Sequence, residues 1–158
     1  MGTILKEGGL RLVKDLRTQG QKVVLAFGVF DLLRVGHTRY LREAKGLGDI
    51  LVLALASDDS IQRTLGPGRP LLPLEDRIGI LAAFEMVDFV TSYSEDDVVP
   101  FLNALKPDVL ACQGDAPQVL GGFPGKVVLL GHSGDEEAEQ LIQVILKKYS
   151  DPNTKINE

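Results

Sequence analysis

Short apolar runs that alternate with amphipathic stretches constrain the fold of this chain more than any other feature of its sequence. The runs at residues 22–27 and 49–56 are almost wholly apolar, which is typical of strands covered on both faces of a sheet. Between such runs, apolar residues recur at helical spacing. Strands that alternate with helices in this way predict parallel βα units.

The predicted fold is a Rossmann-like, doubly wound α/β domain, with helices on both faces of a five-stranded parallel sheet. The strands are expected at residues 22–27, 49–56, 88–93, 108–112 and 126–130. The helices are expected at residues 5–17, 36–45, 57–65, 73–86, 94–106 and 135–149. A chain of 158 residues fits one domain, which we assign to residues 1–149, followed by a polar tail at 150–158.

Composition and charge argue against several classes of protein. The net charge is −5, whereas nucleic-acid binders usually carry a basic surface, so no nucleic-acid partner is expected. The apolar runs are far shorter than the ~20 residues of a membrane span, and the N-terminus lacks the apolar core of a signal peptide. A single cysteine, Cys112, cannot form an internal disulfide and favours a cytoplasmic location. Two histidines and one cysteine do not make a structural zinc site.

The loop that follows the first predicted strand has the properties of a phosphate site. Residues 28–37 lead into a helix start, where unpaired amides and a partial positive charge attract anions. Gly28 and Gly36 lack a Cβ, so the backbone can approach an anion closely there. The chain is acidic overall, but around this loop it is locally basic, with Arg34, Arg39, Arg42 and Lys45 against Glu43. The loop therefore predicts a polyphosphate ligand.

The same loop resembles the cytidylyltransferase-like family of nucleotidyltransferases, whose pattern is Gly-x-Phe-Asp followed by His-x-Gly-His. At these positions the chain has Gly28, Phe30, Asp31, Arg34, Gly36 and His37. Further segments occur in the family's order and spacing, namely Ser57-Asp58-Asp59, Gly68-Arg69-Pro70, Glu75-Asp76-Arg77 and Val87-Asp88. The resemblance covers about residues 22–115. It is greatest to the heptose 1-phosphate adenylyltransferase domain and next to glycerol-3-phosphate cytidylyltransferases.

The resemblance implies an enzyme that transfers AMP or CMP from ATP or CTP to a sugar phosphate or a similar phosphorylated acceptor, with release of pyrophosphate. It implies Mg²⁺ with the nucleotide, and a homodimer is compatible with it. The implied catalytic residues are His37 near the α-phosphorus, Lys45 and Arg34. The implied nucleotide- and phosphate-binding residues are Gly28, Val29, Phe30, Asp31, Gly36, Arg69, Arg77, Gly114, Asp115 and Ser133.

The chain departs from the family pattern at three places. Arg34 replaces the first histidine, and a guanidinium can take over a phosphate contact because it binds phosphate bidentately. Cys112-Gln113 stands before the Gly114-Asp115 pair. The family's Ser-Thr-Thr segment is here residues 133–137, Ser-Gly-Asp-Glu-Glu, whose carboxylates stabilise the positive end of their own helix and repel a triphosphate. Two functions stay open: an active nucleotidyltransferase, or a binding module that kept the pocket and lost turnover.

Several of these residues also have structural interpretations. Lys45 can stabilise the negative end of its helix, and Asp31 can cap the turn that follows it. The ring of Phe30 is expected to pack beneath the site, and Cys112 is expected to be a small buried hydrophobe. A dinucleotide-binding dehydrogenase domain is disfavoured, because no Gly-x-Gly-x-x-Gly turn follows the first predicted strand.

Overall fold

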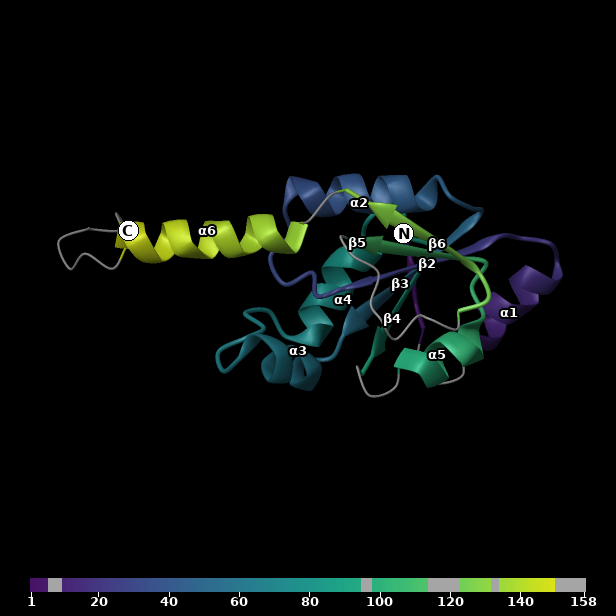
Figure 1. Ribbon diagram of the computed structural model, residues 1–158, viewed down its shortest axis with the longest axis horizontal. Coiled ribbons are helices and arrows are strands. Elements are labelled where there is room, and N and C mark those ends of the chain that lie inside the picture. The colour runs from purple at the N-terminus through teal and green to yellow at the C-terminus, as the bar shows by residue number, and fades with distance from the viewer. Residues whose placement is uncertain (6–9, 95–97, 114–122, 132–133, 150–158) are drawn as a thin grey trace.

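A six-stranded, all-parallel sheet forms the centre of the computed structural model, which describes residues 1–5, 10–94, 98–113, 123–131 and 134–149 (Figure 1). The strand order is β1-β4-β3-β2-β5-β6. The strands are β1 (Thr3–Ile4), β2 (Val23–Gly28), β3 (Ile50–Ala56), β4 (Phe89–Tyr93), β5 (Val109–Gln113) and β6 (Lys126–Leu130). The helices are α1 (Leu10–Thr18), α2 (Val35–Lys45), α3 (Asp58–Leu65), α4 (Leu74–Ala82), α5 (Val98–Leu105) and α6 (Gly134–Tyr149). The doubly wound Rossmann-like fold is confirmed.

The predicted number of strands is corrected from five to six by β1 at the edge of the sheet. Its two residues, Thr3 and Ile4, pair with Phe89 and Val90 of β4. A strand of two residues is too short to produce a recognisable alternation, so its residues carried no strand signal. The helix expected from residue 5 begins at Leu10, with residues 6–9 outside the described ranges.

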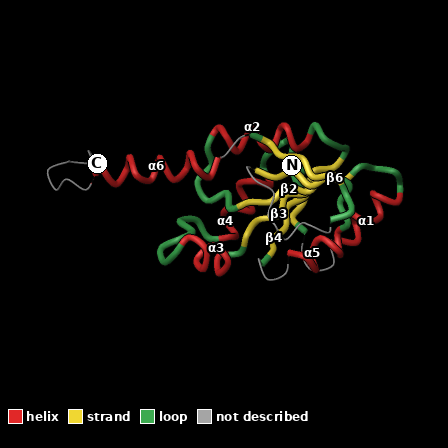
Figure 2. The backbone as a smooth tube through the Cα atoms, in the orientation of Figure 1, coloured by secondary structure: helices red, strands yellow, loops and turns green. Residues whose placement is uncertain are grey.

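Helices cover the two faces of the sheet, which forms the yellow central layer of Figure 2. Because neighbouring strand residues point to opposite faces, Val24 and Ala26 of β2 pack with α2 and α4, whereas Val23 and Leu25 pack with α1 and α5. All seven residues of β3 are buried, as the uninterrupted apolar run predicts for a strand covered on both faces.

The order of the strands reverses between β2 and β5. From β2 the chain builds outward through β3 and β4, and it then crosses to place β5 and β6 on the other side of β2. Ligands of such sheets bind beyond the carboxyl ends of the strands at this reversal. The segment that leaves β2 at this point leads directly into α2, so the fold puts the start of α2 at the expected ligand position.

Helix α4 ends earlier than the sequence predicts, whereas α6 matches its predicted range to within one residue. The helix expected over residues 73–86 ends at Ala82, because the Ala83 and Phe84 amides donate to the Ile80 and Leu81 carbonyls and form a turn. The first turns of α6 pack against α2, and the helix then extends away from the sheet (Figure 1). None of the helices within the described ranges has the length and apolarity needed to cross a bilayer.

Candidate active site

The first turn of α2 holds His37 in one orientation. Arg34 precedes the helix with an extended backbone (φ −127°, ψ 167°), and its N–H donates to His37 Nδ1 at 3.0 Å. A neutral imidazole that accepts at Nδ1 carries its proton on Nε2. His37 therefore presents an N–H donor on its other nitrogen, which is the group that a phosphate oxygen requires. The Arg34 side chain is exposed at the same helix start.

The ring of Phe30 packs against the ring of His37. Phe30 is 1% exposed, and its ring centroid lies 5.1 Å from that of His37. Its backbone adopts φ 51°, a left-handed conformation that a non-glycine residue rarely takes and that costs about 1–3 kcal/mol. This turn folds the ring back over Gly28, where a Cβ would lie 2.8 Å from it. The packing role expected for Phe30 is confirmed, and the missing Cβ of Gly28 makes room for the ring.

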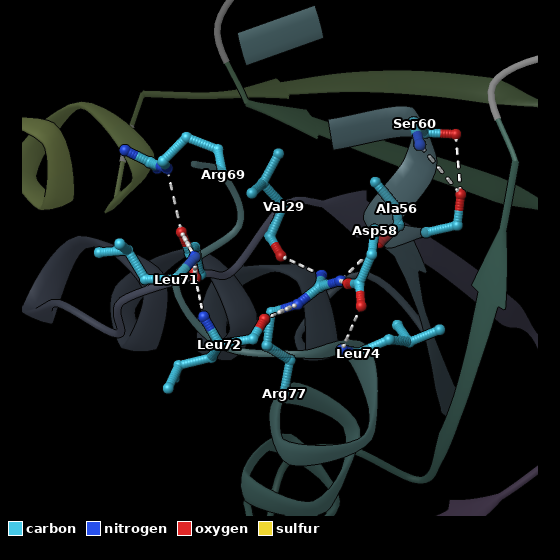
Figure 3. Close-up of polar contacts among 11 residues, drawn as sticks. Val29, Ala56, Asp58, Ser60, Arg69, Leu71, Leu72, Leu74 and Arg77 are labelled. Atoms are coloured by element: carbon cyan, nitrogen blue, oxygen red, sulfur yellow. Dashed lines mark hydrogen bonds and ion pairs between the residues drawn. The ribbon is translucent and has the colours of Figure 1, made fainter. Parts of the chain in front are cut away.

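Asp31 ties the loop after β2 to the loop before α4. Its carboxylate is 1% exposed and accepts from the Leu71 and Leu72 amides at 2.8–2.9 Å. Arg69 Nε lies 3.1 Å from Asp31 Oδ2, and Arg69 Nη1 lies 2.8 Å from Glu139 Oε2 in α6. Figure 3 labels the three residues whose nitrogens lie against this carboxylate, Arg69, Leu71 and Leu72. Asp31 thus caps backbone amides, and Arg69 connects it to α6.

Arg77 is enclosed by protein acceptors. Its side chain has no exposed surface, and its guanidinium donates to the carbonyls of Leu72 (3.1 Å), Val29 (2.8 Å) and Ala56 (3.0 Å), and to Asp58 Oδ1 (2.5 Å) (Figure 3). These four acceptors belong to three separate segments at the carboxyl edge of the sheet: the loop after β2, the connection from β3 to α3, and the loop before α4. The expectation that Arg77 reaches a phosphate is corrected, because this geometry commits its donors to holding those segments together.

Lys45 lies at the wrong end of α2 for the role implied by the resemblance. It is eight residues after His37, which is roughly 12 Å along a helix. Its Nζ donates to the Asp49 carbonyl (2.6 Å) and to Asp88 Oδ2 (2.5 Å), near the starts of β3 and β4. The prediction of a phosphate contact for Lys45 is therefore corrected, and the alternative of stabilising the end of α2 is supported.

The first turns of α6 cover the start of α2. Gly36 N–H donates to Glu137 Oε2 at 3.0 Å. The backbone of Gly134 lies against His37, where a Cβ would be 2.2 Å from ring atom Cγ, and His37 is fully buried. The acidic residues of this segment are expected to stabilise their own helix, and Glu137 also accepts from an amide at the start of α2. Gly36 and Glu137 are 101 residues apart, so no local pattern signalled their contact.

Three predicted site residues, Gly114, Asp115 and Ser133, lie outside the described ranges. Within those ranges, a depression of about 460 Å³ opens at the carboxyl edge beside Asp58 and Arg69. Larger depressions of about 670 and 700 Å³ lie at the opposite edge, where Arg17 and Lys106 line both. The donors at the start of α2, and not the cavity volume, distinguish the candidate site.

Cys112 takes no part in the candidate chemistry. Its side chain is 1% exposed, and burial raises the pKa of its thiol to about 11. The thiolate, which is the reactive form, is therefore scarce at neutral pH. The prediction of a small buried hydrophobe is confirmed.

The parallel, doubly wound sheet, with a histidine-bearing helix start at its strand-order reversal, defines a class of α/β domains suited to phosphorylated ligands. The cytidylyltransferase-like family model matches residues 25–144. The chain belongs to this family, as the resemblance of its loop to the family pattern predicts.

Curated relatives and solved structures agree with this assignment. The chain is 41% identical to the bifunctional protein HldE of Alcanivorax borkumensis over 143 residues, covering 86% of this chain and 30% of that protein. It is 40% identical to HldE of Syntrophotalea carbinolica, covering 92% of this chain and 31% of that protein. The chain thus spans about 30% of the length of these relatives.

The solved structures match the fold. The lipopolysaccharide core biosynthesis protein from Thermoplasma volcanium superposes with a TM-score of 0.66 and 28% identity, covering 72% of this chain and 99% of that one. A pantoate-beta-alanine ligase from Francisella tularensis, solved with beta-gamma ATP and beta-alanine, gives a TM-score of 0.59 at 16% identity, covering 100% of this chain and 82% of that one. At 16% identity, the match with the ligase supports the fold alone.

Proposed function

We propose that this chain is a nucleotidyltransferase that transfers AMP or CMP from a nucleoside triphosphate to a sugar phosphate or a similar phosphorylated acceptor. The observation that carries the proposal is the His37 ring at the start of α2, whose Nδ1 accepts from the Arg34 amide at 3.0 Å. Membership of the cytidylyltransferase-like family supports the reaction class. The resemblance to the heptose 1-phosphate adenylyltransferase domain favours a sugar phosphate acceptor.

In the proposed reaction, a phosphate oxygen of the acceptor attacks the α-phosphorus of the nucleotide. The bond between the α-phosphorus and the bridging oxygen breaks, and pyrophosphate leaves. His37 Nε2–H would donate to an α-phosphate oxygen as charge develops there, and Arg34 would neutralise neighbouring phosphate charge. Catalysis of this kind depends on positioning and electrostatic stabilisation.

Mg²⁺ is proposed as part of the nucleotide substrate. Proteins commonly hold Mg²⁺ through one or two carboxylates together with substrate phosphates. Among the described residues no cluster of three or more histidine, cysteine or carboxylate ligands is present. A metal that arrives on the triphosphate, and neutralises part of its charge, fits such a site. A homodimer stays a prediction.

The contact between Glu137 and Gly36 favours a second candidate function. A chain that keeps a carboxylate on this amide can be a nucleotide- or partner-binding module without useful turnover. Pyrophosphate release separates the two functions. The protein is incubated with Mg²⁺, each of the four nucleoside triphosphates and a panel of sugar and polyol phosphates, and pyrophosphate is measured by a coupled assay. Release that depends on both a nucleotide and an acceptor supports the transferase, and nucleotide binding without release across the panel supports the binding module.

A further inference from the structure

Helix α6 brings two carboxylates onto two groups that are expected to bind phosphate. Glu137 Oε2 accepts from the Gly36 amide at 3.0 Å, and Glu139 Oε2 lies 2.8 Å from Arg69 Nη1. Gly36 lies in the first turn of α2 and Arg69 in the loop before α4, yet two residues of one helix, α6, engage both. Carboxylate and phosphate oxygens are acceptors of the same kind for an amide or a guanidinium. Two carboxylates of the protein itself therefore occupy two groups that are expected to bind phosphate.

The seating of α6 on α2 depends on glycines on both sides. A Cβ on Gly36 would lie 2.9 Å from Glu137 Oε1 and 3.0 Å from Gly134 Cα. A Cβ on Gly134 would lie 2.2 Å from His37 Cγ. Ala138, in the same part of α6, is 2% exposed. Because the two helix backbones approach this closely, the Glu137 carboxylate lies within hydrogen-bonding distance of the Gly36 amide.

We infer that Glu137 and Glu139 determine the anion affinity of this site: they hold the Gly36 amide and Arg69 in the free protein, and a polyphosphate binds there only by displacing them. The inference rests on the proposed function, which assigns nucleotide phosphates to the same groups. Glu137 lies in the segment 133–137, which stands where the resembled family has Ser-Thr-Thr. A hydroxyl in this segment adds a donor for phosphate, whereas the Glu137 carboxylate competes with it.

The turn that carries Glu137 also covers His37. Gly134 and Glu137 lie in the first turn of the same helix, so a ligand that moves this whole turn away from Gly36 also moves the backbone that lies against the His37 ring. Binding at the Gly36 amide and access to His37 Nε2 are thereby coupled through α6.

Isothermal titration calorimetry with inorganic tripolyphosphate, at pH 7.5 and fixed ionic strength, tests the inference. Wild type is compared with Glu137→Gln, Glu139→Gln and the double variant. Each substitution keeps the side-chain shape and removes the charge. Glu85→Gln is the matched control, since Glu85 is exposed at the opposite edge of the sheet and its replacement changes the net charge equally. Glu139 is half-exposed, so Glu139→Gln keeps the test valid if the Glu137 variants fail to fold.

The double variant is expected to bind tripolyphosphate about tenfold more tightly or better, with intermediate gains for the single variants and no gain for Glu85→Gln. Equal or weaker binding by the double variant overturns the inference while leaving the proposed function standing. Tight binding of tripolyphosphate by the double variant, without nucleotide binding or pyrophosphate release, supports the inference and contradicts the proposed function. No binding of tripolyphosphate to any form overturns both.

Discussion

Replacement of Arg77 by methionine tests whether this buried guanidinium holds the carboxyl-edge loops together. Methionine keeps much of the apolar stem and removes every donor. The Ala56 carbonyl is then left buried without its partner, and the Val29 and Leu72 carbonyls lose theirs in partly buried positions. The carboxylate of Asp58 is 43% exposed, so water can replace much of that ion pair.

The magnitude follows from these groups. An unsatisfied buried carbonyl at Ala56 costs about 1–3 kcal/mol, and each of the other two carbonyl contacts contributes about 0.5–1.5 kcal/mol. Together they give a loss of about 4 kcal/mol, within a range of about 2–6 kcal/mol. For a domain of this size, that loss lowers Tm by about 8–16 °C. Since whole domains are stable by about 5–15 kcal/mol, the variant is expected to fold and to have a measurable transition.

Urea unfolding of wild type, Arg77→Met and Arg39→Met measures the effect. Arg39 is exposed on α2, and its replacement is expected to change the free energy of unfolding by no more than about 0.5 kcal/mol. A loss below about 1 kcal/mol for Arg77→Met, with an unchanged m-value, would refute the structural role assigned to Arg77.

Three further outcomes are expected. His37→Asn keeps an acceptor for the Arg34 amide and removes the Nε2 donor, so pyrophosphate release by the folded variant should fall by about 10²–10³-fold; an unchanged rate would show that His37 takes no part in the chemistry. Tyr40→Phe leaves the buried Ala111 carbonyl without the 2.8 Å bond from the hydroxyl and should cost about 1–3 kcal/mol in urea unfolding. Because the pKa of Cys112 is raised from 9.0 to about 11, the unfolded state loses its thiol proton first as pH rises, so stability should decline between about pH 9 and 11. A Cys112→Ala variant should lack that part of the decline, and equal pH profiles for both proteins would contradict the assignment.

The fold and the loop after β2 were largely predictable because their signals are local. A strand buried on both faces needs an unbroken apolar run, and β3 has one. A serine directly before a helix is a local capping signal, and the Ser57 Oγ before α3 accepts from the Ser60 amide at 3.3 Å. The glycines, Phe30 and His37 are spaced in the sequence as the turn between β2 and α2 requires. Such features depend on neighbours within a few residues.

The roles of the charged residues were less predictable, because their partners are distant in the sequence. Arginine is a residue type that often binds phosphate, but the hydrogen-bond acceptors of Arg77 include the carbonyl of Val29, 48 residues away in the sequence. Glu137 finds its donor across 101 residues. Lys45 is different, since the rise of an α-helix already separates it from His37 by roughly 12 Å. That distance, which follows from the sequence positions alone, places Lys45 away from the start of α2.

The most direct test of the account is the amide spectrum of the isotope-labelled protein during titration with Mg²⁺ and ATP or CTP. The account predicts saturable chemical-shift changes for the Gly36 and His37 amides at the start of α2. It predicts smaller chemical-shift changes for the Gly20 and Lys22 amides, which line the depression of about 670 Å³ at the opposite edge of the sheet. Shifts that gather around Gly20 and Lys22, or no saturable shift with either nucleotide, would contradict a phosphate site at the start of α2.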